Sequence, residues 1–184
     1  MSRKLIAFVA LAIVGGLMTG MVSDAVAGHE LIGAPKCKMC HKAKTGDQWA
    51  KWEGSKHAGA FATLGTDAAK AVATEKGLGD PQKEEACLKC HATQAFLGRD
   101  VVVNAKGKYE DAEGVGCEAF HGPGSDYKSK KVMEDSEAAK AAGLVMDKSE
   151  EFCVKCHNEE SPTFKGFVFA DRWAEIAHPV PEAE

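Results

Sequence analysis

The chain has 184 residues, a formal net charge of −4 and an aromatic content of only 7%. This length suits one domain, and the slight acidic excess gives no reason to expect a nucleic-acid partner, which would call for a basic face. Large aliphatic side chains are thinly spread among Ala, Gly, Lys and Glu. Such a chain buries little apolar surface to offset the entropy of ordering its backbone, so we expect a non-protein group to fill part of the interior.

The first 27 residues have the features of an export signal. Two basic residues, at positions 3 and 4, precede an almost wholly apolar run from Leu5 to Met18, and Ala25–Ala27 supplies the small residues of a cleavage site. Cleavage would leave residues 28–184 as one domain with a net charge of −5, in the periplasm or outside the cell. The alternative is an uncleaved anchor, because the apolar run extends to Val22. The small-residue site favours cleavage, after which we expect no membrane span.

Signals for short helices recur along the chain. Asp and Ser favour helix starts and Gly favours helix ends, and one segment, Val101–Tyr109, has the pattern of a small β-hairpin. We therefore expect a mainly α protein of short helices and loops packed around bound groups. Three helices are expected from their starts alone: one at Asp47 that carries Trp49 and Trp52, one at Ser55 that carries His57, and one at Asp80-Pro81. Four more are expected over whole ranges, namely Asp67–Lys76, Ser136–Ala142, Ser149–His157 and Asp171–Ala177.

Three copies of the motif C-x-x-C-H are present, at 37–41, 87–91 and 153–157. In this pattern two thiols add across the vinyl groups of one haem, and the histidine binds its iron as the proximal ligand. Zinc sites or disulfides would explain the cysteine pairs, but not the histidine after each pair. The motifs predict haem c attached through Cys37, Cys40, Cys87, Cys90, Cys153 and Cys156, with His41, His91 and His157 as proximal ligands.

A further segment has the same spacing but lacks one cysteine. In Cys117-Glu118-Ala119-Phe120-His121, Phe120 stands where the second cysteine would be, which explains the odd total of seven cysteines. We expect a fourth haem here, held by one thioether to Cys117 and by His121. The alternative is a site without haem, which would leave Cys117 as a free thiol prone to oxidation.

Three histidines remain outside the motifs, namely His29, His57 and His178. They are the candidate distal ligands, since histidine is a common sixth ligand of haem iron, and Met133 and Met146 are alternatives. Four haems and three spare histidines do not balance. One iron would therefore be open, be bound by a weaker ligand, or be completed by a neighbouring subunit.

Three stretches resemble the tetrahaem cytochrome c-554 family: Gly33–Lys36, Trp52–His57 and Gly114–Gly124. The resemblance covers Leu31 to His157, and a third site of the form V-G-C-E-x-C-H-G-P-G recurs in that family. It implies stacked and perpendicular haem pairs, mostly bis-histidine ligation, and electron shuttling between periplasmic partners. Some members keep one five-coordinate haem. This chain departs from the pattern at Phe120, and it has no histidine between His91 and His121.

These features favour an electron carrier with redox proteins as partners over an enzyme, because irons saturated by two histidines exchange electrons without binding a substrate. One alternative is an enzyme acting on a small nitrogen oxide at an open haem. Another is a self-assembling extracellular filament subunit, in which His29, near the mature N-terminus, completes an iron of the next copy.

Overall fold

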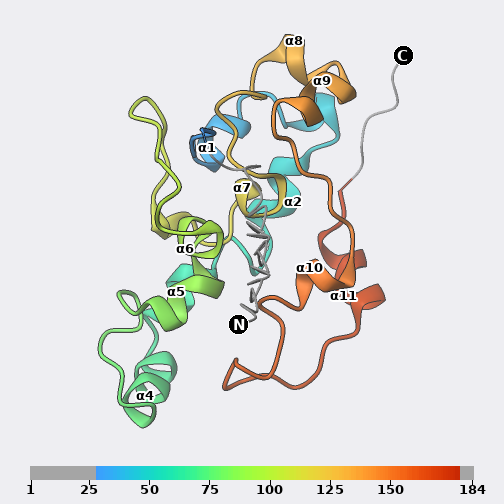
Figure 1. The fold of residues 1–184 in the computed structure, drawn as a ribbon. Helices are drawn as coiled ribbons and strands as arrows, with labels where there is room; N and C mark the ends of the chain where they lie inside the picture. Colours follow the sequence, from blue (N-terminus) through green and yellow to red (C-terminus); the bar gives the residue numbers. More distant parts are fainter. Residues whose placement is uncertain (1–27, 179–184) are drawn as a thin grey trace, which may run out of the picture.

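The computed structural model describes residues 28–178, in which short helices alternate with turns and loops (Figure 1). No β-strand forms within this range, which confirms the mainly α class. The predicted signal peptide, residues 1–27, lies outside the described residues. The elements, in chain order, are α1 (Ala34–Cys37), η1 (Ala43–Thr45), α2 (Gln48–Glu53), α3 (Ala60–Leu64), α4 (Asp67–Glu75), α5 (Glu85–His91), α6 (Thr93–Leu97), η2 (Asp111–Glu113), α7 (Cys117–His121), α8 (Lys130–Met133), α9 (Ser136–Ala141), α10 (Glu150–Cys153) and α11 (Phe169–Ile176).

Several helix starts follow the predicted caps. Ser149 caps α10 by accepting a hydrogen bond from the Phe152 backbone N–H at 3.2 Å, and α4 and α9 lie within a residue of their predicted bounds. Two predicted starts are wrong. Ser55 does not begin a helix, and α5 begins at Glu85 because the residues after Pro81 form a turn first.

The predicted hairpin at Val101–Tyr109 is also wrong, because the two arms of this segment bond to a distant part of the chain and not to each other; within the segment, the Gly107 N–H bonds to the Asn104 carbonyl at 2.7 Å in a turn. Leu31 donates its N–H to the Val102 carbonyl at 2.9 Å and accepts a hydrogen bond from the Asn104 N–H at 2.8 Å. The Lys108 N–H bonds in turn to the Ile32 carbonyl at 2.7 Å. The segment does bond to another stretch of backbone, but its partner is the segment before α1.

Helix α7 lies near the centre of the molecule (Figure 1). It contacts α1 on one side and α6 on the other, and α5 connects α6 to α3. In Figure 1, α4 lies at one end of the molecule and α8 and α9 lie at the opposite end. The motif at Cys117–His121 therefore occupies the junction between the two ends.

The buried apolar core is small, as the composition suggests. One cluster joins Leu64, Leu88 and Ala92, with Phe61 packed against it. Residues 28–178 contain no helix that is both long and apolar enough to cross a membrane.

A buried carboxylate connects the N-terminal segment to α7. Glu118 is 1% exposed, and its two oxygens accept hydrogen bonds from three backbone N–H groups, those of Ile32, Gly33 and Gly124, at 2.7–3.2 Å. These bonds satisfy donors that would otherwise be buried without a partner. Glu118 therefore holds α1, which carries the first motif, against α7, which carries the third.

Candidate haem-binding sites

Each of the four motifs forms one turn of helix. In α5 and α7 the whole motif is helical, while α1 and α10 each end at the first cysteine of their motif. In those two motifs the turn continues, because the backbone N–H groups of His41 and His157 bond to the carbonyls of Cys37 and Cys153 at 3.0 and 3.1 Å. A helical turn brings residues three and four apart onto one face. Each motif thus presents its attachment positions and its histidine together.

Two of the motif histidines are oriented as metal ligands. The Nδ1 atom of His91 lies 2.7 Å from the Ala60 carbonyl oxygen, and that of His121 lies 2.9 Å from the Val145 carbonyl oxygen. A carbonyl only accepts, so each Nδ1 carries the proton and each Nε2 keeps its lone pair. Metal-binding histidines are held in this way by their outer hydrogen bond. The donor set of these motifs therefore fits haem c.

Two candidate distal histidines each lie opposite a motif histidine. The ring centroids of His57 and His157 are 6.0 Å apart, and those of His121 and His178 are 5.9 Å apart. Two imidazoles on opposite sides of one metal, with metal–nitrogen bonds of about 2.0 Å, would have centroids about 6 Å apart. In each pair the two imidazoles are thus far enough apart that both could hold one iron, although they are 100 and 57 positions apart in sequence.

The imidazole of His57 is neutral at ordinary pH. Burial, and then the nearby charge of His157, lower the pKa of His57 to about 4, and burial also lowers the pKa values of His121 and His157. Neutral imidazole is the form that binds metal. The backbone at His57 is fixed by Gly114, whose φ of 72° brings it so close that an added Cβ would lie 2.5 Å from the His57 carbonyl oxygen.

The candidate attachment cysteines lie near one another in pairs that belong to different motifs. Cys117, together with burial, raises the pKa of the Cys37 thiol, and Cys90, together with burial, raises that of Cys156. These effects require the two side chains of each pair to be close. The first motif is thus adjacent to the third, and the second is adjacent to the fourth.

The ring of Phe120 lies in an aromatic group at the third motif. Its centroid is 5.2 Å from that of His57 and 6.0 Å from that of Phe152, and both rings are inclined to it. Edge-on contacts of this kind are favourable between aromatic rings. Phe120 is therefore part of the packing around the His57–His157 pair, while Cys117 remains the one thiol of its motif.

The other candidate ligands lie elsewhere. Nδ1 of His29 is 2.5 Å from Oδ2 of Asp126, and the His29 ring packs against Gly143. Among residues 28–178, no ring contact joins His41 or His91 to a second histidine. Met133 is half-buried and Met146 is 40% exposed.

Three helical C-x-x-C-H turns, one of them with its histidine oriented by a backbone carbonyl, are typical of a c-type cytochrome. Comparison with known proteins agrees. Residues 36–122 match the family described as cytochrome c554 and c-prime. Cytochrome c-554 of Nitrosomonas europaea is 30% identical over 149 residues. Both matches support a member of the cytochrome c-554 family, which implies haem c as the cofactor.

The alignment with the Nitrosomonas protein includes 73% of this chain but 60% of that protein, so the chain spans somewhat more than half the length of its relative. No solved structure matches the chain significantly.

Proposed function

We propose that this protein is a multihaem electron carrier, and the pairing of attachment cysteines is the observation that carries the proposal. Cys37 lies near Cys117, on helices α1 and α7 that contact each other, and Cys90 lies near Cys156. Haem c, when bound, supplies an iron that takes up and releases one electron. Attachment residues that lie near one another bring their sites close enough for electrons to pass between them. The protein would therefore act as a relay.

We assign four haems, at motifs 1, 2 and 4 through two cysteines each and at the third motif through Cys117 alone. The ring separations support His57 as the distal ligand opposite His157, and His178 as the one opposite His121. His29 remains the candidate for a third iron, which would leave one iron without a second histidine. The export signal supports a periplasmic or extracellular carrier that exchanges electrons with redox proteins.

A reductive titration tests this function. The purified oxidised holoprotein is titrated anaerobically with dithionite while its visible spectrum is recorded. We expect uptake of four electrons, one for each site, and rapid reoxidation by a soluble electron acceptor. A protein that takes up no electrons, or that releases none to any acceptor, would rule out the relay.

Replacing His57 or His178 with alanine tests the ligand assignment. We expect each variant to convert one haem from low to high spin in the electron paramagnetic resonance spectrum, because an iron that loses a strong axial ligand changes its spin state. Phe167→Ala is the matched control, since Phe167 stacks on His157 at 4.9 Å but supplies no ligand. An unchanged spectrum in both histidine variants would refute the assignment.

A second function, reaction with a small nitrogen oxide at an open iron, is favoured by one observation. His91 is held by the Ala60 carbonyl, but no second histidine contacts its ring within residues 28–178. An exchangeable coordination position is what such chemistry requires. If the reduced protein binds neither carbon monoxide nor nitric oxide, this function is excluded and the relay remains.

A further inference from the structure

Among the cysteines of the four motifs, the one that reaches the surface belongs to the first motif. Cys40 is exposed, whereas the other six cysteines are half-buried. Its neighbour Met39 is 72% exposed, which is unusual for so apolar a side chain. A group bonded to Cys40 would therefore have one edge at the surface, next to an apolar contact point.

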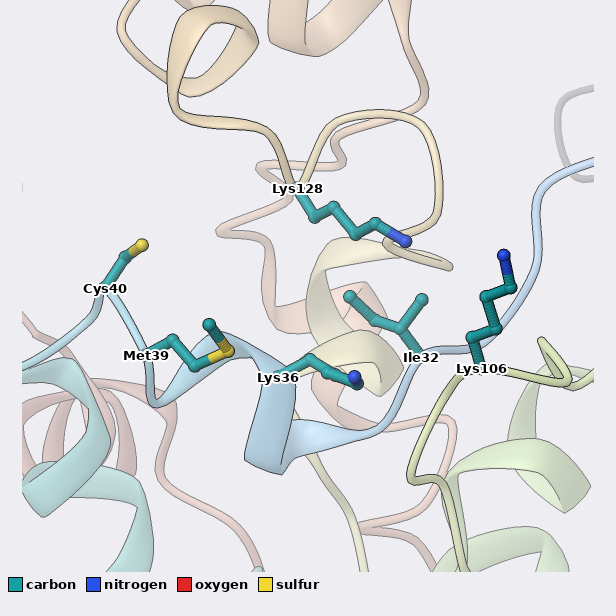
Figure 2. A pocket seen from close by; sticks show the side chains of 6 residues that line it. All are labelled: Ile32, Lys36, Met39, Cys40, Lys106 and Lys128. Atoms are coloured by element: carbon teal, nitrogen blue, oxygen red, sulfur yellow. The ribbon is translucent and has the colours of Figure 1, made fainter.

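Three lysines line a cavity beside this exposed position. A cavity of about 320 Å³ is lined by Ile32 and Met39, by Cys40, and by three lysines (Figure 2). The three lysines come from separate parts of the chain: α1, the loop after Val103, and the turn before α8. They are Lys36, Lys106 and Lys128.

The positive charge at this cavity is not neutralised by ion pairs. Within residues 28–178, none of the three lysines lies within 4.0 Å of a carboxylate oxygen. The charge of Lys128 favours the ionised forms of Glu118 and Asp126 without forming an ion pair with either. Glu118 is buried against backbone N–H groups, Asp126 pairs with His29, and Glu30 bonds to Asn104. The cavity is thus a local positive site on a chain that has more acidic than basic side chains.

We propose that this cavity, which we call the lysine port, docks the acidic face of a redox protein and is where electrons enter or leave. The inference rests on the proposed relay function and deepens it. The exposed apolar side chain of Met39, beside charged lysines, is suited to the small, transient interfaces of electron transfer. Charge complementarity steers a partner to one orientation and raises the association rate. Here that orientation places the partner beside the first attachment site.

Salt dependence with an anionic oxidant tests the port. The fully reduced holoprotein is mixed in a stopped-flow instrument with hexacyanoferrate(III), and each encounter transfers one electron to one ion without a proton. A particle of net negative charge should react faster as salt screens repulsion, whereas attraction at the port makes the rate fall with added salt. We expect the second result, and a loss of about tenfold in rate at low salt in the triple variant Lys36→Gln, Lys106→Gln, Lys128→Gln.

The matched control removes the same charge elsewhere. Lys70 lies on α4, Lys76 directly follows it, and Lys83 lies in the turn before α5. Helix α4 is at the end of the molecule away from the helices that carry the port (Figure 1). Changing these three lysines to glutamine should leave the rate close to wild type. Equal losses in the two triple variants, or a rate that rises with salt in the wild type, would overturn the port while leaving the reductive titration unaffected.

A binding measurement separates a protein partner from a small anion. Fluorescence anisotropy of a labelled hexaglutamate peptide should show salt-sensitive binding to the wild type and to the α4 control, and loss of binding to the port variant. If the port variant slows hexacyanoferrate but the peptide does not bind the wild type, the cavity is a small-anion site and the docking proposal is wrong.

Discussion

Changing Cys117 to serine is expected to lower the mass of the denatured mature protein by one haem. Cys117 is the one thiol of its motif, because Phe120 occupies the second attachment position. A haem held there by a single thioether survives denaturation, but a haem held through His121 alone would dissociate. Intact mass spectrometry of wild type and variant under denaturing conditions makes the comparison. Equal masses, apart from the substitution, would contradict a thioether at Cys117.

Changing Phe120 to cysteine is the complementary experiment. Thioether formation is an addition, so we expect the number of haems to stay the same while a second thioether consumes the remaining vinyl group. Loss of a conjugated vinyl shifts the absorption of the reduced pyridine complex to shorter wavelength. Ala119→Cys, one position earlier on α7, is the control, since the spacing then no longer fits the motif. A gain of one whole haem in Phe120→Cys would show that the wild-type site carries none.

Glu118→Ala is expected to cause the largest loss of stability. Removal of the carboxylate would leave the backbone N–H groups of Ile32, Gly33 and Gly124 buried without acceptors. Each unsatisfied donor costs about 1–3 kcal/mol, so the three together cost about 3–9 kcal/mol, against a total stability of about 5–15 kcal/mol for a typical domain. We expect little holoprotein to accumulate and a strongly reduced urea midpoint in what does.

Glu113→Ala provides the comparison for Glu118. Glu113 accepts one backbone hydrogen bond, from the Ala34 N–H at 3.0 Å, and burial raises its pKa to about 8. Its loss should cost about 1–3 kcal/mol. If urea unfolding of the holoproteins gives equal losses for the two variants, the hydrogen bonds to Glu118 are not what connects α1 to α7.

The candidate attachment motifs could be recognised in the sequence because their chemistry is local. Two thiols and a histidine within five positions form one helical turn, whatever the rest of the chain does. The same holds for α4, whose cap and final residues lie next to it in sequence. Local signals in the sequence therefore predict the motifs and several of the helices.

What depends on distant contacts could not be predicted. Nothing near His57 in the sequence indicates that it lies opposite His157, because that meeting depends on how Gly114 packs against the His57 carbonyl. Glu118 occupies a variable position of its motif, and its role appears only once the segment before α1 lies against α7. The Val101–Tyr109 segment failed as a hairpin for the same reason, since its partner is at Leu31.

Intact mass spectrometry of the purified mature holoprotein, denatured before measurement, is the most direct test that this chain is a c-type cytochrome with four attachment sites. We expect a chain that begins at Gly28 and carries the mass of four haems. A mass that corresponds to three haems would contradict only the attachment of a haem to Cys117. A chain without covalently bound haem would contradict the central claim.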